Sequence, residues 1–156
     1  MAAALVHAEP AASTAPLPSS VLCRLGPFDV GPDGTLSPSG ACGSVRFAFL
    51  WRGRRVQAEL GPGRRVRFAI AAARIPYTAE QPRRRASALA AVLALRAGGE
   101  PNLAAVLTPA HEVRLEEEVT LQATTASNLV AAAVRFVLRA EPYLQLLEEE
   151  GAVSPG

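Results

Sequence analysis

Two arginine pairs are the residues of this sequence best suited by type and spacing to bind a partner. Arg54-Arg55 and Arg64-Arg65 each lie beside a glycine. Guanidinium groups pair with phosphates and carboxylates, so these residues could hold nucleic acid or an acidic protein. About eight extended residues, at roughly 3.3 Å each, separate the pairs by about 25 Å. They form one patch only if further arginines bridge them, namely Arg46, Arg52 and Arg67. Otherwise the pairs are the solvated ends of strands.

Glu117 is the second candidate. Val113, Leu115 and Val119 share one face of a predicted strand, and Glu117 falls on that apolar face. An unpaired buried carboxylate is costly, so the simpler interpretation is a bulge or strand end that turns Glu117 to solvent. Two alternatives remain: an inward acid paired with an arginine at a partner-binding surface, or a small enzyme that uses Glu117 with a nearby arginine. The candidate partner-binding set is Arg52, Arg54, Arg55, Arg64, Arg65, Arg67 and Glu117.

Groups for catalysis or metal binding are sparse. His7 lies in a predicted tail and His111 in a turn, while Cys23 and Cys42 have no second Cys/His pair to complete a zinc site. The chain has no HExxH, no GxSxG and no glycine-rich phosphate loop ending in lysine. We therefore expect no enzymatic activity, no cofactor, no metal and free thiols.

The charge is unevenly distributed along the chain. The net charge is +2, but residues 46–85 carry eleven arginines against two glutamates and residues 101–156 carry three arginines against eight glutamates. Such polarity could steer an anionic partner or favour contact between subunits. Residues 1–20 lack the positive start of an export signal and predict a disordered tail. No apolar run approaches the roughly 20 residues that span a bilayer. We expect a cytoplasmic protein that does not bind membranes.

The elements that position these residues follow from hydrophobic period. From Val45 apolar and polar residues alternate, which predicts a strand to Trp51, a second strand after Gly53, and a third that ends before Pro76. Such short connections predict an antiparallel meander. Residues 82–97 predict a helix, and two strands follow, at 102–107 and 112–121. Asp33-Gly34 indicates a possible extra N-terminal hairpin, Val21 to Val30 against Thr35 to Leu36.

The last predicted element is a helix that begins near Thr125 or Ser127. Pro142 lies within its apolar stripe, so we expect a kink or restart near Glu141. The sequence thus predicts an α+β fold in the order β-β-β-α-β-β-α, with an antiparallel sheet and both helices on one face. The chain is predicted to divide into a disordered tail at 1–20, a single α+β domain at 21–150 and a flexible tail at 151–156.

This order of elements resembles the YbjN-like group of bacterial proteins, which are similar in fold to type III secretion chaperones. The likeness is carried by "RRRASALAAVLALRAGGEPNLAAVLTPAHEVRLEEEVTLQATTASNLVAAAVRFVLRAEPYLQLLEE" and covers roughly Val45 to Glu149, with "AEPYLQLL" in place of the family's aromatic-proline feature. The family usually opens with an amphipathic helix, where this chain offers a possible hairpin. The resemblance implies a non-enzymatic, chaperone-like homodimer that binds a partner polypeptide. The alternative function is an arginine-mediated nucleic-acid or anionic-surface binder.

Overall fold

The structure is a computed structural model that describes residues 21–39, 43–75, 82–98 and 102–150. The predicted tails, 1–20 and 151–156, lie outside the described residues. Within the described residues, eight strands form two antiparallel sheets and two α-helices accompany them, so the predicted α+β class is confirmed. The chain order from the fourth strand onwards is β-β-β-α-β-β-α, as the sequence predicts.

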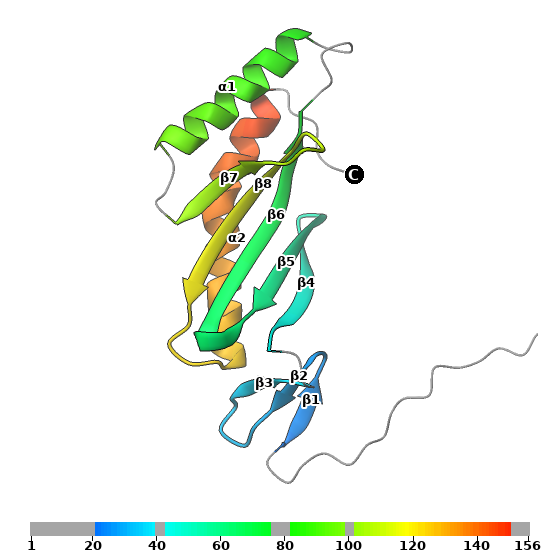
Figure 1. Ribbon diagram of the computed structural model, residues 1–156, viewed down its shortest axis with the longest axis vertical. Coiled ribbons are helices and arrows are strands. Elements are labelled where there is room, and N and C mark those ends of the chain that lie inside the picture. The colour runs from blue at the N-terminus through cyan, green and yellow to red at the C-terminus, as the bar shows by residue number, and fades with distance from the viewer. Residues whose placement is uncertain (1–20, 40–42, 76–81, 99–101, 151–156) are drawn as a thin grey trace, which may run out of the picture.

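The larger sheet has five strands in the spatial order β4-β5-β6-β8-β7 (Figure 1). Its strands are β4 (Val45–Trp51), β5 (Arg54–Leu60), β6 (Arg65–Arg74), β7 (Leu103–Leu107) and β8 (Glu112–Thr120), and a 3-10 turn, η1 (Pro62–Arg64), precedes β6. Arg52 and Gly53, both at positive φ, form the two-residue turn from β4 to β5, which suits the twist of a hairpin. Helix α1 (Pro82–Gly98) leads to the β7–β8 hairpin, and β8 then pairs with β6.

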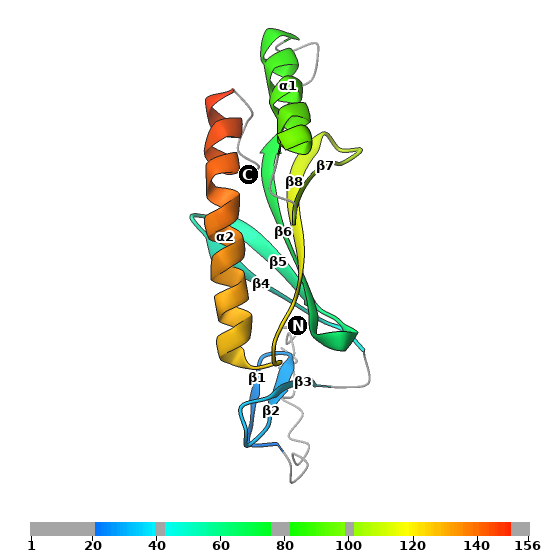
Figure 2. The same ribbon diagram turned by 90° about the vertical axis from the view of Figure 1, so that its left-hand side faces the viewer.

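Helix α2 (Ala126–Glu149) lies along one face of this sheet, which we call the helix face, and α1 lies at the end of the sheet beside β7 (Figures 1 and 2). Helix α2 contacts β6 and β8, while α1 contacts β7 and α2. The alternating residues of each strand that point to the helices are buried or half-buried and form the core. Phe68 of β6 stacks on Phe136 of α2 with ring centroids 5.4 Å apart. The expected cover of one face is therefore provided by α2, while α1 packs on β7 and on α2.

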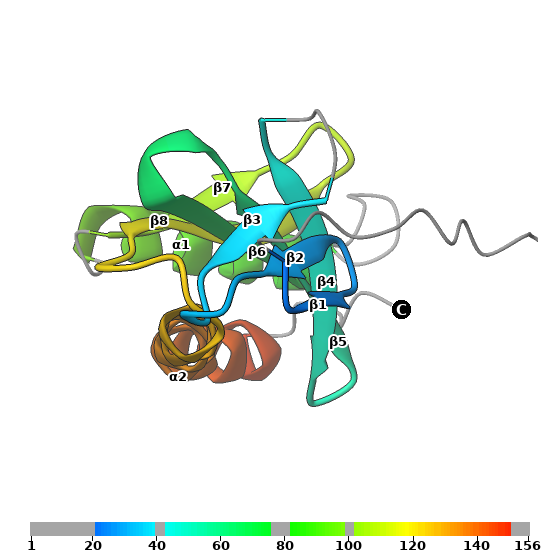
Figure 3. The same ribbon diagram turned by 90° about the horizontal axis from the view of Figure 1, so that it is seen from below.

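The predicted N-terminal hairpin is part of a small three-stranded sheet. Strands β1 (Cys23–Leu25), β2 (Phe28–Val30) and β3 (Leu36–Pro38) pair in that order, and the β2–β3 turn contains Asp33 and Gly34, the latter at φ 78°. The small sheet lies at the end of the molecule opposite α1, beneath the start of α2 (Figures 1 and 3). Phe28 meets Phe47 of β4 edge to face at 5.6 Å, and the Leu36 N–H donates to the Thr124 carbonyl. These contacts close one end of the core.

Helix α2 begins where the sequence indicates. Thr125 is the N-cap, and its hydroxyl accepts a hydrogen bond from the Asn128 N–H at 3.3 Å. The expected restart near Glu141 does not occur, because α2 continues through Pro142 as one helix. Ala140, Leu144 and Leu147 pack into the core on both sides of the proline, and this burial outweighs the one backbone hydrogen bond that proline deletes.

Candidate functional site

The face of the five-stranded sheet opposite the helices, which we call the open face, carries the candidate site. None of the described helices packs on it. Strand pairing aligns its outward side chains in rows that cross the strands. One row is a ladder of alternating charge, Arg46–Glu59–Arg67–Glu118. The next is mostly small, Ala48–Gln57–Ala69–Glu116–Ala104. The third is interrupted: Leu50 pairs with Arg55, and Ala71, Arg114 and Val106 pair across the other three strands, but the β5–β6 pairing ends between the two groups.

A hollow of about 510 Å³ opens over these rows. Ala48 and Ala69 give it a low floor, because an alanine side chain leaves the sheet surface uncovered between longer neighbours. Longer polar side chains surround the floor, namely those of Arg46, Arg55, Gln57, Glu59, Arg67, Arg114 and Glu116. A second hollow of about 400 Å³ lies beside it and shares Arg55 and Arg114. The open face is thus a shallow polar trough with a small-residue floor.

Most arginines of the charge ladder are paired with glutamates of the open face itself. The Arg46 Nε donates to the Glu59 carboxylate at 3.1 Å, and Arg67 pairs with Glu116. Hydrogen bonds from Arg46 and Ser44 hold the pKa of Glu59 below its ordinary value, while the Glu116 carboxylate raises the pKa of Arg67. Arg65 is further from its acid, 3.9 Å from Glu118. Most cations on this side of the trough therefore already have counterions.

Arg55 and Arg114 are different. Arg55 is exposed and makes no hydrogen bond or ion pair with any other described residue. Arg114 donates to the Gln57 side-chain oxygen, a neutral acceptor, at 3.1 Å. Arg114 pairs with Ala71 of β6, and Arg55 lies on β5 one residue beyond the last β5–β6 pair, Val56 and Ile70. Both arginines line the second hollow. Because β6 lies between β5 and β8, two strand spacings, roughly 10 Å, separate the two strands, and one segment crossing the trough could contact both arginines.

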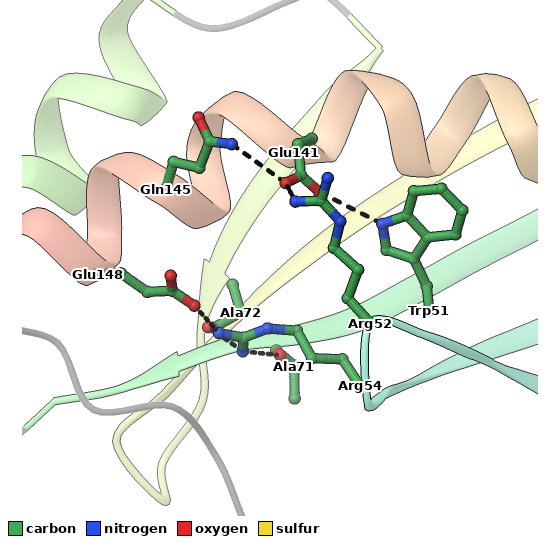
Figure 4. A network of polar contacts seen from close by, with 8 residues as sticks. All are labelled: Trp51, Arg52, Arg54, Ala71, Ala72, Glu141, Gln145 and Glu148. Carbon is green, nitrogen blue, oxygen red and sulfur yellow. Dashed lines mark hydrogen bonds and ion pairs between the residues drawn. The ribbon is translucent and has the colours of Figure 1, made fainter.

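Arg52 does not line the trough, and Arg54, which borders the second hollow, has its guanidinium engaged elsewhere. They point to the helix face, where Arg52 pairs with Glu141 of α2 and Arg54 pairs with Glu148 (Figure 4). Trp51 adds a hydrogen bond from its indole N–H to Glu141 at 3.3 Å.

Arg54 has a structural role in this network. Its side chain is only 10% exposed and donates to the carbonyls of Ala71 and Ala72, at 3.3 and 2.7 Å. The register of β6 shifts between Ala71 and Ala73, and the β5–β6 pairing ends before it, at Val56 and Ile70. Arg54 thus satisfies strand carbonyls at an irregularity, which revises its predicted partner-binding role.

Glu117 is buried within β8, opposite Phe68 and Leu103, so the predicted bulge or solvent-facing strand end is wrong. Its carboxylate lies 2.5 Å from the guanidinium of Arg139 on α2. Glu117 is thus an inward acid paired with an arginine, but the pair joins α2 to β8 inside the fold and does not lie at an exposed partner-binding surface. A residue 2% exposed cannot form part of a docking surface, and this revises its predicted role.

The two predicted arginine pairs do not converge. Arg64, at φ 62°, donates to the Gln122 carbonyl, and Arg65 points to the open face at the far end of β6. Arg46 and Arg67 do lie between the pairs on the open face, but the glutamates alternating with them cancel their charge. Of the predicted set, Arg55, Arg65 and Arg67 share the open face. The sequence-based prediction missed Arg114. The signal that could have placed it on the open face was its position between Val113 and Leu115, which point to the helix face.

Among the described residues, no three His, Cys, Asp or Glu side chains gather in a way that could hold a metal ion. Within the same residues, no helix is long and apolar enough to cross a membrane. Cys23 is a free, exposed thiol, and Cys42 lies outside the described residues. No protein-family model matches the chain, and no curated protein matches it.

Proposed function

We propose that this protein is a non-enzymatic, chaperone-like protein-binding module, which holds a segment of a partner polypeptide on its open face and acts as a homodimer. The observation that carries the proposal is the trough: a floor of alanines beside two arginines, Arg55 and Arg114, that lack acidic partners among the described residues. A low floor allows a backbone to approach the sheet closely. The resemblance in element order to the YbjN-like group supports the same function.

The chemistry of the trough defines the segment that it would hold. Arg55 and Arg114 suit a carboxylate, because charge-assisted hydrogen bonds are stronger than neutral ones. Leu50 lies beside Arg55 in the same row and is 74% exposed, so it offers an apolar contact. We therefore propose a segment with an acidic residue close to an apolar one. A cytoplasmic location accompanies the proposal, since the exposed free thiol of Cys23 suits a reducing compartment.

A peptide selection tests this function. A displayed library of random peptides is panned against the full chain, and the enriched peptides are synthesised and titrated by fluorescence anisotropy. Replacing Arg55→Ala and Arg114→Ala together should weaken binding at least about tenfold, since each charge-assisted bond contributes roughly 1.5–3 kcal/mol. Arg24→Ala, on the small sheet, should leave affinity unchanged. Failure to enrich any peptide, or equal affinity of the double variant, contradicts the proposal.

The second candidate is an arginine-mediated nucleic-acid or anionic-surface binder, supported by the +9 of residues 46–85 and the exposure of Arg55 and Arg65. Two features favour a protein partner instead. Glutamates are interleaved with the arginines of the open face, and the aromatic residues of β4, namely Phe47, Phe49 and Trp51, point to the helix face, where no base could stack on them.

A single-stranded DNA oligonucleotide distinguishes the two candidates. Nucleic-acid binding must weaken steeply as salt rises and must be lost on replacing Arg55→Glu and Arg65→Glu. Arg54 is left intact in this test because its guanidinium is part of the fold. If the wild-type chain shows no salt-sensitive retention of the oligonucleotide, the nucleic-acid candidate is dropped.

A further inference from the structure

Helix α2 carries a second apolar surface, on the side that faces away from the sheet. Its core side is made of seven buried residues: Leu129, Ala132, Phe136, Val137, Ala140, Leu144 and Leu147. An amphipathic helix packed on a sheet is expected to be polar on its opposite side. Here that side carries a row of five exposed apolar residues at a constant spacing of four: Val130, Val134, Leu138, Pro142 and Leu146.

These residues, which we call the outer ridge, are well exposed. Val130 is 61% exposed, Val134 45%, Leu138 59% and Leu146 37%. Single exposed apolar residues are normal on a protein surface, but a continuous row marks an interaction site. Residues four apart on a helix are neighbours, so the ridge is one uninterrupted strip that winds across the outer side of α2.

We propose that the outer ridge is the interface of the homodimer, with α2 of a second copy packed antiparallel across it at Leu138. The ridge is symmetric about that residue, so a two-fold axis through Leu138 brings Val134 of each copy to Pro142 of the other. Two ridges of residues four apart run parallel to each other when the helices cross at about −50°. At that angle Val134, Leu138 and Pro142 form the centre of contact, and Val130 and Leu146 lie at its margin.

Charge complementarity indicates a second copy rather than a different protein. The charged residues beside the ridge include Arg135, three residues before Leu138, and Glu141, three residues after it. An antiparallel copy with its axis at Leu138 therefore brings Arg135 of each helix towards Glu141 of the other, in the half that leads to the negative end of the helix dipole. A parallel copy would place like charges together. The outer side of α2 is therefore complementary to itself in one orientation.

This inference rests on the homodimer of the proposed function and assigns its surface. Figure 2 shows α2 on one side of the five-stranded sheet. The ridge is on the side of α2 that faces away from the sheet, so α2 and the sheet separate it from the trough on the open face. Dimerisation through it would leave both open faces available, so each dimer could hold two partner segments.

Sedimentation equilibrium of the full chain, from micromolar to submillimolar concentration, tests the interface. The wild type should approach the dimer mass, and Leu138→Glu should stay monomeric with an unchanged circular dichroism spectrum, because Leu138 is exposed and its replacement leaves the core intact. Leu93→Glu is the matched control, since Leu93 is 63% exposed on α1 and should not affect the dimer. A dimer that survives Leu138→Glu overturns the inference.

Cysteine crosslinking tests the two-fold axis. In a Cys23→Ser, Cys42→Ser background, Leu138→Cys should form an interchain disulfide, because helices 8–10 Å apart place facing Cα atoms within about 6 Å. Val130→Cys should not, because an antiparallel axis at Leu138 separates the two copies of residue 130 by roughly 24 Å along the helices. Crosslinking of residue 130 and not 138 overturns the antiparallel geometry.

Failure of this inference is distinguishable from failure of the proposed function. A dimer that uses another surface removes the outer ridge but leaves the homodimer. A strict monomer at every concentration removes both, while the peptide titrations with Arg55→Ala and Arg114→Ala still decide whether the open face binds a polypeptide.

Discussion

The buried pair of Glu117 and Arg139 predicts an asymmetric response to mutation. Glu117 has a fully buried side chain, whereas the Arg139 side chain is 31% exposed and lies at the margin of the core. Arg139→Met keeps the apolar stem but leaves the carboxylate buried without this cation. Removing one partner of a buried pair costs about 3–5 kcal/mol, and the partial exposure of Arg139 favours the low end, about 3 kcal/mol. Glu117→Leu leaves a guanidinium that can turn to solvent, so it should cost about 1 kcal/mol or less.

Urea unfolding followed by the fluorescence of the single tryptophan, Trp51, measures these effects. The double variant Glu117→Leu, Arg139→Met should return to within about 1 kcal/mol of wild type, because well-packed apolar pairs replace buried ion pairs at little cost. Arg135→Met, at an exposed position one turn earlier, is the control and should change stability by less than about 0.5 kcal/mol. If Glu117→Leu is the more damaging single change, the reasoning from burial is refuted.

Three other outcomes follow from the same contacts. Arg54→Ala should lower the free energy of unfolding by about 2 kcal/mol, because it leaves two carbonyls of β6 without a hydrogen-bond donor. Arg55→Ala should change the free energy of unfolding by less than about 0.5 kcal/mol. Equal effects of the two variants in urea would contradict the assignment of Arg54 to the helix face and Arg55 to the open face. Thr125→Ala should cost about 1 kcal/mol through the lost cap of α2, and an unchanged thermal midpoint would count against it. Hydrogen bonds from Ser39 and then Arg24 lower the pKa of Asp29 below 3.8. The stabilisation of the fold by ionised Asp29 is therefore full above pH 3.8 and is lost as the pH falls through the lower pKa of the folded state. Ser39→Ala should raise the pKa of Asp29 in an NMR titration. An unchanged pKa of Asp29 in this variant would refute the contact.

The five-stranded sheet could be predicted because its strands keep a strict two-residue period. Val56 and Ala58 alternate with Gln57 and Glu59, and only one face of this sheet is covered by described helices, so the apolar set identifies the buried face. The start of α2 was predictable for a local reason, since Thr125 can cap a helix whatever its surroundings. Local rules sufficed where the decisive partner was close in sequence.

Contacts between distant residues were not predictable. The periodicity placed Glu117 inward correctly, but nothing in the sequence says that Arg139 of α2 lies over it on the helix face. Arg54 and Arg55 look alike in sequence, and the two-residue period sends one to the carbonyls of β6 and the other to the trough. Pro142 predicted a kink or restart, and tertiary packing on both sides of it keeps α2 one continuous helix.

Mapping a selected peptide onto the chain by amide chemical shifts is the most direct test of the central claim, that the open face is the binding surface. We expect the largest shifts in the strands that line the trough, β4, β5, β6 and β8, around Ala48, Arg55, Ala69 and Arg114, with α2 unaffected apart from signals already broadened by the dimer. Shifts confined to α2 or to the small N-terminal sheet, with the trough unchanged, would contradict the account.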